Sequence, residues 1–381
     1  MKSNKSDESF SCFPQDKKGV TMAQGTFDLW QQTFTLSLMS NSEQGQKGTA
    51  TELAANLSST IQGRLGNSGL QNLIGSSWEI TWGPCVFQAP DSTCADNAMY
   101  VAHDTVNGIY VVAIAGTNSV SKYDIFTEDL SIKPISWPYG GSVAFGTNIT
   151  TGAKAGVDAL LGMQSQGQTL LSYLQTRADA LRSTLIFTGH SLGGALSPTL
   201  ATALTGKGLN LRDWKVVYVF PTAGPTPGNG AFATYFSQTF PQLAMGSQPW
   251  QVWNADLANG LDVVPCAWNE RTLSSIPTLY APNITASPMV KAKVFALELL
   301  AFGSDYTRIG TANVLEGSSV QGSGNTGAVF EQEALYQHIY AYFQLLGIQA
   351  LLALTDSAGK PLFNPPNPYA SAGTHPVLVS A

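Results

Sequence analysis

A serine flanked by two glycines carries the strongest chemical signal in this sequence. Residues 189–193 read Gly-His-Ser-Leu-Gly, after an apolar run at 185–187 and before a helical pattern at 192–205. A serine on a sharp strand-to-helix turn has strained backbone angles and an exposed hydroxyl, and glycines two positions away avoid collisions within the turn. The pattern predicts that Ser191 is a nucleophile and that the backbone N–H of Leu192 faces a bound carbonyl oxygen. A tight turn without chemistry is the alternative, because a chain with 37 glycines can contain such a pentapeptide by chance.

The serine needs a base, and the sequence offers four histidines. His190 is the neighbour of the serine and should point away from it on the turn. His103 precedes the serine on a predicted hairpin strand, and His375 lies in a tail rich in proline, alanine and serine. In hydrolases built on this turn the chain order is serine, acid, histidine, which favours His338 as the general base. A hydrogen-bonded core histidine is the alternative for this residue.

The imidazole in turn needs a carboxylate that accepts its second N–H, fixes its tautomer and stabilises the imidazolium. We expect this acid to follow a strand that lies between the serine and the histidine. Asp256 and Asp262 both come after the predicted strand at 251–253, and Asp305 is a more distant third candidate. Spacing alone leaves the choice between the first two open.

Strand and helix patterns alternate along the part of the chain that carries these residues. Strand patterns begin at Trp78, and the Asn107-Gly108 pair between two of them predicts a tight type I′ hairpin turn. The later elements are a helix at about 156–181, strands at 185–188 and 215–220, helices at 192–205 and near Phe232, and a strand at 251–253. This alternation predicts an α/β fold with a mostly parallel central sheet and helices on both faces.

Two apolar segments occur nearer the C-terminal end. The run at 335–354 has 20 residues without a formal charge, which is long enough to span a bilayer. It also contains Gln337, His338 and further glutamines, which are costly in lipid. We therefore interpret it as a largely buried helix and predict no transmembrane helix. The other segment, 289–302, is predicted as a helix within an otherwise irregular stretch at 270–330.

The overall composition excludes several classes of protein. The chain has 381 residues, 19 basic and 25 acidic side chains and a formal charge of −6, without a cluster of lysine or arginine. A nucleic-acid partner is therefore not expected. Hydrophobic residues make up 44%, which argues against wholesale disorder. Charged residues make up only 12%, against ~25% in ordinary soluble proteins.

The cysteines and glycines predict neither a metal site nor a cofactor site. The four cysteines, at positions 12, 85, 94 and 266, form no C-x-x-C pair, and the histidines lack metal-ligand spacing. Cys85 and Cys94 could form a disulfide in an extracellular protein or remain two buried thiols. The G-x-G-x-x-G at 322–327 follows no clear strand, so we interpret it as a loop. The first 18 residues contain no apolar run typical of a signal peptide, and the compartment, extracellular or not, stays open.

Four sequence blocks, in order, resemble the class 3 lipase family, the α/β-hydrolases typified by fungal triacylglycerol lipases. They are Val-Val-Ala-Ile-Ala-Gly-Thr at 111–117, Thr-Gly-His-Ser-Leu-Gly-Gly at 188–194, Thr-Ala-Gly-Pro-Thr-Pro-Gly-Asn at 222–229, and Leu-Asp-Val-Val-Pro at 261–265 with His338 further on. The resemblance spans roughly residues 78–350. It departs from the family at Ala115, where an arginine or similarly large residue is usual, and around 151–152, where the family has His-Gly-Phe.

The resemblance implies an α/β-hydrolase fold and roles for individual residues. It implies that Asp262, directly before Val-Val-Pro, is the acid and that Thr117 is a second oxyanion donor beside Leu192. It also implies a lid at 118–130 that covers the cleft in water. The domain organisation that we expect is a disordered leader at 1–22, an N-terminal helical extension at 23–75, the hydrolase domain at 76–355 and an extended tail at 356–381.

The resulting functional hypothesis is a serine hydrolase of carboxylic esters that acts on lipids through an acyl-enzyme and resembles a triacylglycerol lipase. A phospholipase A1 or a short-chain esterase is the alternative among enzymes. A lipase-like lipid-binding or signalling module without turnover is the alternative from another class. The expected partner is a lipid or ester substrate, met at a lipid–water interface, and no cofactor is expected. The sequence does not indicate an oligomeric state.

Overall fold

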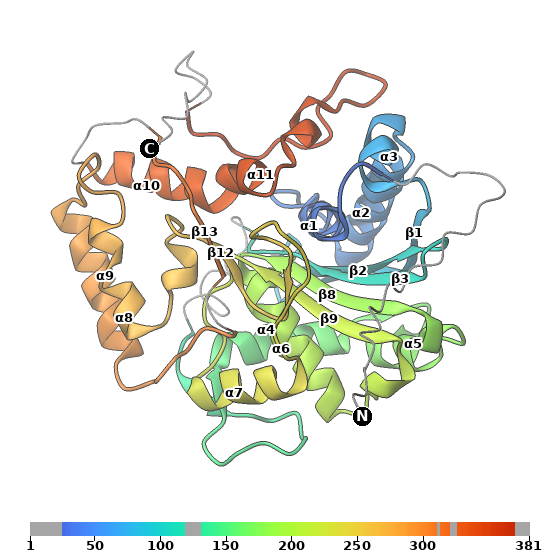
Figure 1. The fold of residues 1–381 in the computed structure, drawn as a ribbon, viewed down its shortest axis with the longest axis horizontal. Helices are drawn as coiled ribbons and strands as arrows, with labels where there is room; N and C mark the ends of the chain where they lie inside the picture. The colour runs from blue at the N-terminus through green and yellow to red at the C-terminus, as the bar shows by residue number, and fades with distance from the viewer. Residues whose placement is uncertain (1–24, 119–130, 311–312, 321–325, 370–381) are drawn as a thin grey trace, which may run out of the picture.

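A seven-stranded sheet forms the centre of the computed structural model, which describes residues 25–118, 131–310, 313–320 and 326–369 (Figure 1). In spatial order the strands are β1 (Trp78–Phe87), β2 (Asn97–Asp104), β3 (Ile109–Ile114), β8 (Thr184–His190), β9 (Val216–Thr222), β12 (Leu257–Asn259) and β13 (Asn313–Leu315). The first three strands pair antiparallel, and the pairs from β3 to β13 are parallel. The prediction of a mostly parallel central sheet is confirmed.

Helices cover both faces of the sheet, as predicted (Figure 1). One face carries α1 (Leu29–Met39), α2 (Ala50–Leu65), α3 (Ser68–Ile74) and α11 (Ala341–Leu345). The other carries α4 (Thr151–Gly162), α5 (Leu170–Gln175), α6 (Leu192–Gly206) and α7 (Gly230–Thr239). Beside β12 and β13 lie α8 (Glu270–Leu273), α9 (Pro288–Ala301) and α10 (Gly327–Leu335). Short ladders pair β4 (Pro134–Ser136) with β5 (Asn148–Thr150), β6 (Gln164–Ser165) with β7 (Gln168–Thr169), and β10 (Leu243–Ala244) with β11 (Val252–Trp253).

The strand sequences explain why two helical layers are needed. Side chains alternate between the two faces of a strand, and β3 is apolar on both. Val112 and Ile114 enter the core shared with α4 to α7, whereas Val111 and Ala113 enter the core shared with the N-terminal helices. A third, smaller core joins residues 261–306 to α10 beside the end of β12.

The N-terminal helices begin at strong caps and pack directly against the sheet. Asp28 and Gln31 form a capping box at the start of α1, and Thr49 and Glu52 form one at the start of α2. Phe34 on α1 is fully buried against the central strands. The segment predicted as a helical extension is thus helical, and it closes one face of the core. The predicted leader at 1–22 lies outside the described residues.

The predicted type I′ turn at Asn107-Gly108 is wrong. Asp104 pairs with Ile109, so four residues rather than two connect β2 to β3. Only Gly108 has a positive φ, of 63°. The Asp104 carboxylate accepts hydrogen bonds from the backbone N–H groups of Val106 and Asn107, both at 3.0 Å, and this side-chain turn replaces the tight backbone turn.

Two long helices predicted from apolar spacing are interrupted. The segment at 156–181 contains α4, the β6–β7 hairpin and then α5, because Gln166 and Gly167 both adopt positive φ and turn the chain back. The run at 335–354 leaves α10 through a π-helical turn, Tyr336–Tyr340, continues as α11 and ends in a 3₁₀ turn at Gln349–Ala353. Among the described residues, no helix combines the length and apolar character needed to cross a membrane.

The strand predicted at 251–253 has a different place from the one expected. It corresponds to β11, which pairs only with β10 outside the main sheet. The strand of the main sheet is β12, three residues long, and it is flanked by β13 in the segment interpreted as irregular. As a result Asp256 precedes the sheet strand, whereas Asp262 follows it.

The start of the predicted tail packs against the N-terminal helices. Leu362 and Phe363 are buried in the same core as α1 and α2, and the Arg64 guanidinium lies 5.0 Å from the centre of the Phe363 ring. Residues 370–381 lie outside the described part of the chain.

Candidate active site

Ser191 lies on a strained turn between β8 and α6. Its φ and ψ are 61° and −127°, which only a tightly constrained turn imposes on a residue other than glycine. A Cβ atom on Gly189 would lie 2.2 Å from the carbonyl oxygen of Gly193, and one on Gly193 would lie 2.5 Å from that of Ile114. The two glycines of the pentapeptide are therefore required by backbone contacts, as the sequence pattern predicts.

The side chains of Ser191, His338 and Asp262 form a continuous hydrogen-bonded chain. Nε2 of His338 lies 2.8 Å from Oγ of Ser191, and Nδ1 lies 2.9 Å from Oδ2 of Asp262. A carboxylate only accepts hydrogen bonds, so Nδ1 carries the proton and Nε2 is free to accept from the serine hydroxyl. His338 is presented by the π-helical turn between α10 and α11. A single-turn π-helix within a helix is a frequent feature of functional sites.

Asp262 is held by groups that sequence reasoning does not identify. It is 1% exposed, and its Oδ1 accepts from the backbone N–H of Val264 at 2.9 Å. The hydroxyl of Tyr342 donates to Oδ2 at 3.0 Å and accepts from the backbone N–H of Asn259 at 2.8 Å. Burial, and then the charge of Asp262, raise the pKa of Tyr342 well above its ordinary value, so this hydroxyl remains a donor. Its position four residues after His338 on a helical segment is the signal that could have found it.

The other two candidate acids lie elsewhere. Asp256 is buried and forms an ion pair with Arg308 at 2.8 Å, while its Oδ1 accepts from the backbone N–H of Gly224 at 3.1 Å. Asp305 accepts through its backbone carbonyl from Gly230 at the start of α7. Of the three aspartates, the structure brings only Asp262 into hydrogen-bond distance of His338.

His190 packs behind the imidazole of His338. The two rings stack at 5.0 Å between centroids, and Nε2 of His190 donates to the backbone carbonyl of His338 at 2.8 Å. Its Nδ1 lies 3.1 Å from the hydroxyl of Thr222. Burial, and then the nearby His338, lower the pKa of His190 to about 3. His190 is thus a neutral support of the His338 backbone, and its ring nitrogens contact Thr222 and His338 rather than Ser191.

The remaining histidines do not reach the serine. His103 pairs with Tyr110 across β2 and β3, and Tyr110 pairs with Leu185 at the start of β8. Ser191 follows the other end of β8, about 20 Å away at the rise of a strand. His375 lies outside the described residues.

The two predicted oxyanion donors lie on segments that touch each other. Leu192 is the first residue of α6, so its backbone N–H has no acceptor within the helix. Thr117 follows Gly116, where a Cβ atom would lie 2.7 Å from the carbonyl oxygen of His190 and 3.2 Å from Cβ of Ser191. The loop after β3 is therefore in contact with the serine turn. Of the predicted lid, residues 119–130 lie outside the described part of the chain.

The described part of the chain contains no group of three or more His, Cys, Asp or Glu side chains that could hold a metal ion. The described cysteines, Cys85, Cys94 and Cys266, form no disulfide, so of the two alternatives for Cys85 and Cys94 the structure has the unbridged one.

Comparison with known proteins connects this site to a family. Residues 111–268 match the family model of class 3 lipases. The matched segment includes Thr117, Ser191 and Asp262. M37 lipase has a similar solved structure, with a TM-score of 0.70 and 27% identity over 88% of this chain and 95% of that one. The predicted resemblance and the α/β-hydrolase fold are confirmed, and both findings support a lipase-like hydrolase.

Two fungal lipases are more distant structural neighbours. The native Rhizomucor miehei lipase in its propeptide complex is 18% identical, with a TM-score of 0.42 over 67% of this chain and 72% of that one. Lipase II from Rhizopus niveus is 17% identical, with a TM-score of 0.43 over 64% and 76%.

The buried His190 predicts a pH-dependent stability. Between its ordinary pKa of 6.5 and its pKa of about 3 in the folded protein, the unfolded chain binds a proton that the folded chain does not. The free energy of unfolding should therefore fall as the pH drops through this range. His190→Gln keeps an amide donor for the His338 carbonyl but cannot titrate. The free energy of unfolding of this variant should therefore fall less steeply as the pH drops. Urea unfolding at a series of pH values measures this, and parallel profiles of the two proteins would contradict it.

Proposed function

We propose that this chain is a serine hydrolase of carboxylic esters that acts on lipids. The observation that carries the proposal is the hydrogen-bonded chain from Ser191 through His338 to Asp262, beside the carboxyl ends of the parallel strands. Its geometry matches the roles of nucleophile, general base and orienting acid. The class 3 lipase match over residues 111–268 supports lipid esters as the substrate class.

In the proposed reaction, Oγ of Ser191 attacks the ester carbonyl carbon while Nε2 of His338 takes the hydroxyl proton. Asp262 stabilises the imidazolium through Nδ1, and the N–H groups of Thr117 and Leu192 stabilise the oxyanion of the tetrahedral intermediate. The intermediate collapses, the C–O bond to the alcohol breaks, and His338 gives its proton to the leaving alkoxide. Water, deprotonated by His338, then attacks the acyl-serine, and a second tetrahedral intermediate releases the carboxylic acid and regenerates Ser191.

The outer face of α9 supports a lipid–water interface as the place of action. Phe295, Leu299 and Phe302 follow at spacings of four and three, so they share a face, and each is at least 60% exposed. Met289 and Leu300 extend this apolar face, and exposed lysines at 291 and 293 stand near it. A helix with an apolar face and lysines beside it is suited to lie in the headgroup region of a lipid surface. The inner face of α9 packs in the third core, which also contains the neighbours of Asp262.

A fluorophosphonate probe tests the nucleophile. It should label Ser191 covalently in the folded protein, because His338 is in place to deprotonate the hydroxyl. Ser191→Ala should remove both the labelling and the hydrolysis of p-nitrophenyl butyrate. Mass mapping of the labelled peptide identifies the site. An unlabelled Ser191 in folded protein would instead support the lipid-binding module without turnover.

A matched pair of aspartate variants tests the orienting acid. Asp262→Asn should lower kcat about 10⁴-fold, as expected when the acid of such a triad is replaced by an amide. Asp256→Asn leaves Arg308 without its charged partner, so it should lower the free energy of unfolding by about 3 kcal/mol while kcat stays within about twofold. Ester hydrolysis and urea unfolding of both variants measure these effects. Equal losses of kcat in the two folded variants would exclude the assigned roles.

The apolar face of α9 can be tested apart from the chemistry. Phe295→Ser combined with Leu299→Ser should weaken adsorption to phosphatidylcholine vesicles at least about tenfold, because each side chain loses apolar contact with lipid. Hydrolysis of soluble p-nitrophenyl acetate should be unchanged. Leu181→Ser, at a leucine that is 73% exposed far from α9, serves as the control. Unchanged adsorption of the double variant would disprove an interfacial role of this helix.

A further inference from the structure

We propose that Asn41 and Gln44, in the turn that follows α1, are positioning residues for the oxyanion loop at Gly116–Asn118. This inference rests on the proposed function, because it assigns to the loop the donor of Thr117. The two residues touch the backbone of the loop and not the reacting atoms, so their role is to fix geometry. Neither belongs to the segment that matches the class 3 lipase model.

Asn41 fixes the first peptide of the loop. The backbone N–H of Gly116 donates to Oδ1 of Asn41 at 2.7 Å. Nδ2 of Asn41 donates to the carbonyl of Ser37 in the last turn of α1, at 3.3 Å. The orientation of the amide is thus determined, since Gly116 can only donate and the Ser37 carbonyl can only accept. Asn41 links the end of a buried helix directly to the loop.

Gln44 fixes the next two carbonyl groups. Its Nε2 lies 2.9 Å from the carbonyl oxygen of Thr117 and 3.3 Å from that of Gly116. The same Nε2 is 2.8 Å from Oδ1 of Asn41, so the two side chains support each other. The carbonyl of Gly116 and the N–H of Thr117 belong to one planar peptide unit. A contact that orients this carbonyl therefore also orients the proposed oxyanion donor.

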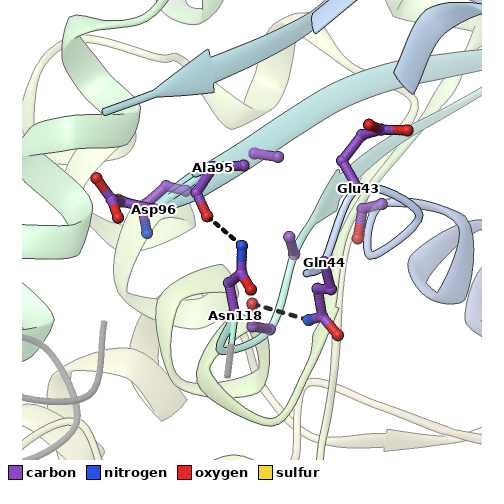
Figure 2. A pocket seen from close by; sticks show the side chains of 10 residues that line it. Glu43, Gln44, Ala95, Asp96 and Asn118 are labelled. Carbon is purple, nitrogen blue, oxygen red and sulfur yellow. Dashed lines mark hydrogen bonds between the residues drawn. The ribbon is translucent and has the colours of Figure 1, made fainter. Parts of the chain in front are cut away.

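Asn118 holds the far end of the loop (Figure 2). Its Nδ2 donates to the carbonyl of Ala95 at 2.8 Å, and its Oδ1 accepts from the backbone N–H of Gly45 at 3.1 Å. Figure 2 shows Asn118 between Ala95 and Gln44 at a pocket lined by these residues. The loop is thus hydrogen-bonded both to the turn after α1 and to the segment before β2.

The close contact of the loop with the serine turn makes this support relevant to chemistry. Gly116 approaches His190 and Ser191 so closely that no Cβ atom would fit there. A shift of the Gly116 peptide therefore changes the position of the Thr117 N–H relative to Oγ of Ser191. Oxyanion donors act at hydrogen-bond distance from the developing charge, and loss of one lowers kcat about 10²-fold or more. A displaced donor should retain part of its effect.

Gln44 offers the cleaner experiment, because it is exposed and its replacement leaves the core intact. In Gln44→Met, kcat for p-nitrophenyl butyrate should fall about tenfold with KM within about twofold. The inhibition constant of phenylboronic acid, whose adduct with the serine mimics the tetrahedral intermediate, should rise by the same factor. Gln44→Glu should be worse than Gln44→Met, since a carboxylate would face two carbonyl oxygens. If Gln44 only filled space, Gln44→Glu should instead retain more activity than Gln44→Met, because Glu resembles Gln more closely in shape.

Gln175→Met is the matched control. Gln175 also donates from Nε2 to a backbone carbonyl, that of Gly208 at 3.1 Å, but it lies away from the loop. This variant should leave kcat and the boronic acid constant unchanged. Amide hydrogen exchange of Gly116 adds a readout that needs no activity, and the exchange should be faster in Gln44→Met than in the wild-type protein.

Several results separate this inference from the proposed function. Ester hydrolysis that survives Ser191→Ala would overturn the proposed function. The positioning role alone would be overturned by unchanged Gly116 exchange in Gln44→Met, by a higher KM at constant kcat, or by equal activity of Gln44→Met and Gln44→Glu.

Discussion

Backbone packing around the serine turn is the constraint on which the rest of this site depends. Two glycines of the turn, Gly193 and Gly194, and Gly116 in the adjoining loop face the ends of three neighbouring strands and leave no space for a side chain. A Cβ atom on Gly193 would meet the carbonyl of Ile114, one on Gly194 would lie 2.4 Å from that of Thr222, and one on Gly116 would meet that of His190. Repulsion at these distances is steep, so the relative positions of β3, β8 and β9 vary little. Ser191 and the adjoining loop are thus fixed by excluded volume, before any side-chain hydrogen bond is considered.

Side chains then fix the groups that have no such backbone constraint. His338 lies on a helix far along the chain, and its orientation depends on the stacked His190, on Asp262 and, through Asp262, on Tyr342. The ring of His190 also contacts Tyr342 edge-on, at 4.9 Å between centroids. Because His190 stays neutral when buried, it supports the backbone of His338 without placing a second positive charge beside the imidazolium.

The parts of the site that could be predicted from the sequence are those indicated by a short local pattern or by a small number of candidate residues. The serine turn has glycines at fixed offsets. Of the four histidines only His338 and His375 follow the serine, and His375 lies in the tail rich in proline, alanine and serine. The choice between Asp256 and Asp262 depends on β12, whose three residues give no periodicity to detect, so only the family resemblance indicated Asp262. Asn41 and Gln44 were missed because they are polar residues in a turn. Their contacts cross more than 70 positions of sequence, which no local pattern encodes.

The N-terminal helices are part of the body that carries the candidate site. Phe34 on α1 packs edge-on against His190, with ring centroids 5.6 Å apart, and stacks at 6.2 Å on Tyr342. The turn that follows the same helix holds the loop of Thr117. One helix thus contacts residues that support His338, Asp262 and the loop at 116–118. A rigid helix that reaches all three couples their positions, because it cannot move relative to one without moving relative to the others. The matched segment at 111–268 therefore includes Ser191 and Asp262 but neither His338 nor the helix that packs against its supports.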